Sequence, residues 1–180
     1  MNKLERYEEE EWVGHAHPRT FIRETTTGPE RLRVGVPKGS LEPVLLLLTL
    51  LDEPLTLLYV LHTPRGGSLP GRYQSPALSR QAVVGVLHEF AAFLTSDSRH
   101  DLWIHGSAAL LVWDRHDVAY FYGDLTDAEE HLRAAGYAAG DVLIPSPHAH
   151  KYHAAFDGDE RSLVAAYEWA HSELRPEDEQ

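Results

Sequence analysis

Alternation of apolar and polar residues is the clearest pattern in the first third of the chain. It predicts a strand at Arg31–Val36 and another at Arg19–Thr25. The segment between them, Thr26–Pro29, contains glycine and proline and has the composition of a turn, so we expect the two strands to form a hairpin. The apolar run Leu55–His62 is short and rich in leucine, and it predicts a buried central strand.

Three short strands with tight turns between them are expected after residue 100, and they predict an antiparallel meander. They are Leu102–His105, Ala108–Trp113 and Val118–Tyr122. Apolar residues at helical spacing, preceded by residues that can cap a helix, predict four helices. The helices are expected at Leu41–Asp52, Ser79–Leu94, Thr126–Gly136 and Asp159–Leu174. A last short strand is expected at Asp141–Ile144.

This order of elements mixes hairpins with helices and favours an α+β fold: a two-layer domain with a mainly antiparallel sheet covered by helices. An α/β fold with a parallel sheet is the alternative. We expect one domain over residues 12–175, because no linker divides it. Residues 1–11 are expected to form an acidic N-terminal tail or frayed helix, and residues 176–180 an acidic C-terminal tail.

Composition narrows the classes of protein that this chain can belong to. Its 180 residues are 43% hydrophobic and 24% charged, as in ordinary globular domains. There is no cysteine, which excludes disulfides, a thiolate nucleophile and a cysteine zinc site. The longest apolar run, Val44–Leu51, is far shorter than the roughly 20 residues of a membrane helix. The first residues are rich in glutamate and lack the apolar core of a signal peptide, so we expect a cytoplasmic protein that does not act on membranes.

The charge of the chain bears on its partners. The formal net charge is −12, which argues against general nucleic-acid binding. Most of the excess acid lies after residue 100, and such a surface can attract a basic protein partner. Association of the chain into a homo-oligomer is an alternative. Arginine outnumbers lysine thirteen to three, a bias typical of GC-rich bacterial genomes.

The strongest chemical signal is a histidine-rich segment near the C-terminus. His148 and His150 are two residues apart, so in an extended segment their imidazoles project to the same side. His153 and Asp157 follow closely and can add a third ligand. These side chains predict a divalent-metal site, zinc first, in which three protein ligands and a water would make a catalytic centre. Residues 15 to 17 form a second His-x-His motif. Contact between the two histidine segments is decisive for the hypothesis of a metal-dependent enzyme.

A second candidate site is the glycine- and arginine-rich segment after the predicted central strand. Gly66 and Gly67 allow backbone N–H groups to approach an anion, and Arg65, Arg72 and Arg80 can bind phosphate or carboxylate. No P-loop or dinucleotide fingerprint accompanies them, so no nucleotide is implied. The segment is therefore a candidate anion-binding loop or partner-docking loop.

Three functions follow as hypotheses. The first is a non-enzymatic, acidic bacterial protein that binds a macromolecular partner, of the immunity-protein or regulatory-adaptor type. The second is a metal-dependent hydrolase that uses His148, His150 and His153, with Arg65 or Arg72 holding an anionic group of the substrate. The third is a small-molecule sensor that binds its ligand on the aromatic residues of the meander.

Overall fold

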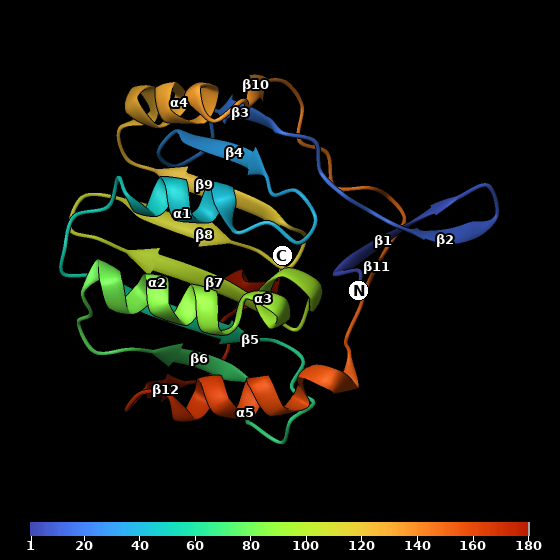
Figure 1. Cartoon of the computed structure of the whole chain (residues 1–180), viewed down its shortest axis with the longest axis vertical. Coiled ribbons are helices and arrows are strands. Elements are labelled where there is room, and N and C mark those ends of the chain that lie inside the picture. Colours follow the sequence, from blue (N-terminus) through green and yellow to red (C-terminus); the bar gives the residue numbers. More distant parts are fainter. Residues whose placement is uncertain (180) are drawn as a thin grey trace.

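A nine-stranded sheet forms the body of the protein, and the computed structural model describes residues 1–179 of the chain (Figure 1). Its strands are β3 Thr20–Glu24, β4 Arg31–Gly35, β5 Thr56–Leu61, β6 Gly71–Gln74, β7 His100–His105, β8 Leu110–Trp113, β9 Val118–Tyr122, β10 Ala138–Ala139 and β12 Ala170–Ser172. They lie in the order β10-β3-β4-β9-β8-β7-β5-β6-β12. Every neighbouring pair is antiparallel except β10 with β3. The α+β fold with a mainly antiparallel sheet is confirmed, and the parallel-sheet alternative is wrong.

Helices cover one face of this sheet, which makes the fold a two-layer structure (Figure 1). They are α1 Glu42–Leu48, α2 Arg80–Glu89, α3 Ala91–Ser96, α4 Leu125–Ala134 and α5 Asp157–Ala165, with short 3₁₀ turns η1 at Ala154–Phe156 and η2 at Pro176–Glu179. The core lies between the layers, where leucine, valine and aromatic side chains from both are buried. No helix within residues 1–179 is long and apolar enough to cross a membrane.

The two faces of the sheet differ because side chains alternate along each strand. In β7, Leu102 and Ile104 are buried against the helices, whereas Trp103 between them is only partly buried on the opposite face. In β9, Phe121 is in the core and Tyr120 is on the opposite face. The second face, which we call the open face, is therefore partly exposed and carries aromatic side chains.

A second, three-stranded sheet projects from the body and corrects the prediction for the N-terminus. Its strands are β1 Leu4–Glu8, β2 Glu11–Gly14 and β11 His148–His150, in the order β11-β1-β2. Residues 1–11 are thus not a tail or a helix, because β1 pairs with β2 and with a segment some 140 residues later. Glu9 and Glu10 form the hairpin turn with φ values of 49° and 66°. Since glutamate seldom adopts positive φ, the acidic run does not indicate this turn.

Other elements differ from the prediction because their partners are distant in the chain. The expected loop after β5 contains strand β6, which pairs with β5 on one side and β12 on the other. The last helix begins at Asp157 and ends at Ala165, and β12 occupies part of the segment expected to be helical. No strand forms at residues 141–144. In the expected C-terminal tail, Asp178 is buried and pairs with Arg72 on β6.

Candidate metal centre

Strand β11 brings two histidines to the same side of the small sheet. Its pairing with β1 places His148 opposite Arg6 and His150 opposite Leu4. Because the segment is extended, the two imidazoles share a face, and their ring centroids are 5.2 Å apart. The spacing of two residues in the sequence predicts this local arrangement.

A third histidine, His116, reaches the same place from the turn between β8 and β9. Asp114 shapes this turn, because its Oδ1 accepts hydrogen bonds from the backbone N–H groups of His116, at 2.9 Å, and Val118, at 3.0 Å. Asp117 adopts a φ of 58° at the end of the turn, and its carboxylate lies 3.1 Å from the ammonium of Lys3. The position of His116 therefore follows from a turn that several hydrogen bonds hold in place.

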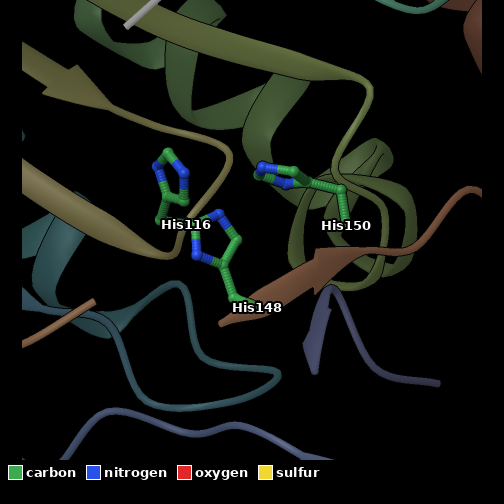
Figure 2. A group of neighbouring side chains, drawn as sticks. All are labelled: His116, His148 and His150. Atoms are coloured by element: carbon green, nitrogen blue, oxygen red, sulfur yellow. The ribbon is translucent and has the colours of Figure 1, made fainter. Parts of the chain in front are cut away.

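The three imidazoles converge (Figure 2). One ligand nitrogen from each of His116, His148 and His150 lies within 4.8 Å of the other two. Zinc binds imidazole nitrogen at about 2.0–2.1 Å in tetrahedral geometry, which separates two ligand atoms by about 3.4 Å. Small rotations of the side chains, of about 1 Å at the nitrogen atoms, would complete this geometry. The group has the ligand number of a catalytic zinc site, in which a fourth position is left for water.

Hydrogen bonds behind the imidazoles orient two of them. The Nδ1 atom of His116 lies 3.0 Å from Oδ2 of Asp114, and Nδ1 of His148 lies 2.8 Å from the carbonyl oxygen of Pro145. A carbonyl can only accept, so His148 carries its proton on Nδ1 and presents the lone pair of Nε2. The Asp114 carboxylate acts in the same way on His116. Such outer partners fix the tautomer and raise the basicity of metal ligands.

His150 differs from the other two because no described atom makes a hydrogen bond to its buried Nδ1. Burial lowers its pKa to about 3, and the neighbouring His116, Arg115 and His148 act in the same direction. The imidazole is therefore neutral at neutral pH, which is the form that binds metal ions. A buried polar atom without a partner is uncommon in folded proteins, and a bound cation would give a nitrogen of this ring a partner.

The second His-x-His segment contacts the turn that carries His116. His17 is buried, and its Nε2 donates to the backbone carbonyl of His116 over 2.9 Å. Its Nδ1 is then free to accept from Nε2 of His15 over 3.4 Å. Burial, followed by His17, Arg6 and His148, lowers the pKa of His15 to about 4. His15 and His17 thus form a hydrogen-bonded chain that supports the backbone of His116.

His153 and Asp157, the other two predicted metal ligands, are placed elsewhere. The Nε2 of His153 donates to the carbonyl of Asn2 over 2.9 Å. Asp157 accepts hydrogen bonds from Arg65 and Arg99 at the start of α5. The extended segment ends at His150, and His153, just before η1, and Asp157, at the start of α5, are not members of the three-histidine group.

The glycine-rich loop does cradle an anion, and that anion belongs to the chain itself. The carboxylate of Glu160 accepts hydrogen bonds from the backbone N–H groups of Arg65 and Gly66, each at 2.9 Å, and of Ser68, at 3.3 Å. Gly67 has a φ of 98°, a conformation that favours glycine. A Cβ atom on Gly66 would lie 2.5 Å from the carbonyl oxygen of Asp157, so glycine is required for this close approach.

The remaining arginines of this candidate site also have partners within the chain. Arg72 pairs with Asp178, and the guanidinium of Arg80 donates to the carbonyl oxygen of Leu51. Arg65 and Arg72, which the hydrolase hypothesis assigns to an anionic substrate group, therefore each hold a carboxylate of the protein. The structure does not bring either guanidinium to the three imidazoles.

A cleft of about 460 Å³ runs along the open face and reaches His116, one of the three converging histidines. Asp114 and His116 line one end, and Trp103, Tyr120 and Tyr122 line the part over the sheet. The C-terminal turn η2 and Ile144 border it from outside the sheet. A second hollow, of about 780 Å³, is bordered instead by residues such as Ser107 and Thr126. The cleft thus places a space for a small molecule beside His116, whereas His148 and His150 do not line it.

No protein-family model, curated protein or solved structure matches this chain. The features that bear on the function are therefore the three-histidine group, the cleft and the projecting hairpin.

Proposed function

We propose that this protein is a metal-dependent hydrolase that holds a zinc ion on His116, His148 and His150. The observation that carries the proposal is the convergence of one nitrogen from each imidazole within 4.8 Å, and one of the three, His116, also lines a cleft. Hydrogen bonds to Asp114 and to the carbonyl of Pro145 support it, because they orient two of the imidazoles as metal ligands. Three protein ligands are typical of catalytic zinc, whereas structural sites have four.

The chemistry supported by such a site is attack by water on an ester, amide or phosphoester. Zinc lowers the pKa of its bound water to about 7, so that hydroxide forms near neutral pH. The hydroxide oxygen would form a bond to the electrophilic carbon or phosphorus atom, the bond to the leaving group would break, and the proton of the attacking hydroxide would pass to the leaving oxygen or nitrogen atom. The ion also stabilises the negative charge that develops on the substrate oxygen.

Metal content tests the site directly. Untagged protein purified without chelator is expected to contain near-stoichiometric zinc by elemental analysis, or to acquire it in a titration that raises the melting temperature. His116→Ala, His148→Ala and His150→Ala should each abolish high-affinity binding. The matched control is His131→Ala, since His131 is an exposed histidine on α4 that should leave zinc binding unchanged. Equal zinc content in all five proteins, or none in the natural chain, would overturn the site.

Turnover tests the reaction class separately. Zinc-loaded protein is expected to hydrolyse p-nitrophenyl acetate or bis(p-nitrophenyl) phosphate, and His116→Ala should lose this activity. A protein that binds zinc on these histidines but hydrolyses neither compound faster than its metal-free form would exclude the hydrolase and leave only a metal site.

Binding of a basic protein partner is the second candidate function, and the projecting hairpin β1–β2 favours it (Figure 1). Tyr7 and Trp12 lie opposite each other on the two strands, each is 47% exposed, and their ring centroids are 5.3 Å apart. Glutamates at positions 8 to 11 surround this aromatic pair. Exposed tyrosine and tryptophan often dominate the energy of interfaces, and the acidic tip would attract a basic surface.

This second function, of the immunity or regulatory-adaptor type, has its own test. A partner captured by the natural chain should be purified and its affinity measured at low and high salt. Weaker binding at high salt and loss of binding in Trp12→Ala would support the proposal. Binding that responds to neither change would exclude the hairpin as the docking element.

A further inference from the structure

We infer that the cleft selects a substrate with an uncharged planar ring next to the bond that is hydrolysed. This inference rests on the proposed metal-dependent hydrolase and names the class of molecule that its site would accept. It is carried by the side chains of the open face, which the zinc site itself does not use.

The floor of the cleft is a row of side chains from three neighbouring strands. Val112 on β8 lies opposite Trp103 on β7 and opposite Tyr120 on β9. Opposite residues on neighbouring strands are about 5 Å apart, so the two aromatic residues flank the valine across a width of about 10 Å. Leu110 and Tyr122 form the next pair along the same strands. A flat apolar ring fits such a floor better than a bulky or strongly polar group.

The row of side chains leads toward one of the proposed zinc ligands. Val112 and Asp114 are two residues apart, which corresponds to about 7 Å along an extended chain, and Asp114 and His116 line the same cleft as the row. A substrate whose ring rests on Val112 would therefore direct the group that is hydrolysed along the cleft toward His116.

Four acidic side chains line the cleft and the arginines beside it are paired, so its charges disfavour an anionic ring. The guanidinium of Arg31 lies 4.2 Å from the ring centroid of Tyr120, but its Nε donates to Glu24 over 2.8 Å. Arg72, whose guanidinium lies 5.4 Å from the ring of Trp103, pairs with Asp178. Both arginines are thus neutralised by carboxylates of the chain. An anionic ring would have to displace one of these ion pairs.

Trp103 presents an apolar surface to the cleft. Its indole Nε1 is shielded from solvent and has no hydrogen-bond partner among the described residues. Because this nitrogen is shielded, the part of Trp103 that lines the cleft is the apolar surface of the indole ring, which suits a flat apolar ring.

Three hydroxamic acids with the same zinc-binding group test the inference on the zinc-loaded natural protein. Benzohydroxamic acid carries a planar ring, cyclohexanecarbohydroxamic acid a non-planar ring of the same size, and acetohydroxamic acid no ring. We expect the benzoyl compound to bind roughly tenfold or more tightly than the acetyl compound, and more tightly than the cyclohexyl compound. Calorimetry or competition for zinc-dependent turnover gives the three affinities.

Variants of the cleft locate the effect. Trp103→Leu and Tyr120→Leu should bind zinc as the natural chain does but lose most of the preference for the benzoyl compound. Leu69→Ala removes an exposed side chain that does not line the cleft and should keep the preference. Equal affinity for the three compounds on zinc-loaded natural protein, or a preference that survives both cleft substitutions, would overturn this inference alone. A chain that binds no zinc overturns the proposed function and this inference together.

Discussion

Replacing Glu160 by glutamine should strongly destabilise the protein, because this carboxylate joins α5 to the loop after β5. Glu160 is fully buried, and it lies 2.8 Å from a guanidinium nitrogen of Arg99, which is also fully buried. The same carboxylate accepts three backbone N–H groups of residues 65 to 68. Asp97 is the second partner of Arg99, again at 2.8 Å.

The magnitude follows from the bonds that glutamine cannot make. Its amide oxygen can still accept, but its NH₂ group would face donors that now meet a carboxylate oxygen. Each charge-assisted hydrogen bond that is lost costs about 1.5–3 kcal/mol, and removing one partner of a buried ion pair costs about 3–5 kcal/mol. We therefore expect E160Q to lose about 4 kcal/mol of unfolding free energy. For a chain of this length, that loss corresponds to roughly 10 °C in Tm.

The difference in unfolding free energy between the natural chain and E160Q should also depend on pH. Burial alone would raise the pKa of Glu160, but the hydrogen bonds from Arg65, Arg99, Gly66 and Ser68 outweigh it and hold the pKa below its ordinary value of 4.5. A lowered folded-state pKa stabilises the protein above the unfolded-state value, and this contribution is lost as the pH falls through the folded-state value. The difference between the natural chain and E160Q should therefore be constant from pH 7 to about 5 and shrink at lower pH.

Urea unfolding, followed by circular dichroism, measures this difference. The control is Glu173→Gln, since Glu173 is exposed and its replacement should change stability by less than about 0.5 kcal/mol. A loss below about 1 kcal/mol in E160Q, or a deficit that stays constant down to pH 3, would refute the reasoning.

Three further predictions concern other parts of the molecule. His100 is buried with neither ring nitrogen hydrogen-bonded, and burial, followed by Lys3 and Arg99, holds its pKa well below 6.5. Lowering the pH from 7.5 to 5.5 should therefore reduce the unfolding free energy of the natural chain by about 1.4 kcal/mol more than that of the His100→Phe variant, as measured by urea unfolding. Equal reductions in the two proteins would contradict this prediction. Replacing Glu9 and Glu10 by Asn and Gly should stabilise the chain by up to about 1 kcal/mol, because both positions have positive φ; an unchanged unfolding midpoint would count against it. Asp114→Asn should weaken zinc binding about 10- to 100-fold in a competition titration, since it alters the partner of His116, and unchanged affinity would exclude that role.

The central elements of the fold can be predicted from the sequence because their patterns are local. Alternation in β4, the meander β7–β9 and the capped helix α2 each contain their own signal, and all of them are present in the structure. Strands β1, β6 and β12 were missed because their pairing depends on segments far away in the chain. A run of glutamates or a glycine-rich stretch becomes a strand only when such a partner provides the hydrogen bonds.

The same distinction applies to the candidate metal centre. His148 and His150 were found because two ligands on one strand have a fixed spacing. His116 was missed as a ligand because it lies more than thirty residues earlier, and its only local signal is Asp114 two residues before it. His153 was selected for its closeness in sequence, but the extended segment ends before it.

The three imidazoles come from two separate sheets, and this origin has a consequence for the hairpin. His116 belongs to a turn of the large sheet, whereas His148 and His150 belong to β11, which pairs with β1 of the hairpin. An ion bound by all three would act as a cross-link that restricts how the small sheet moves against the large one. Coupling between two binding sites is reciprocal, so a protein that prefers one orientation of the hairpin would change the affinity for the ion by the same factor as the ion changes the affinity for that protein. Binding of the ion and binding of the protein partner would then be linked in one thermodynamic cycle.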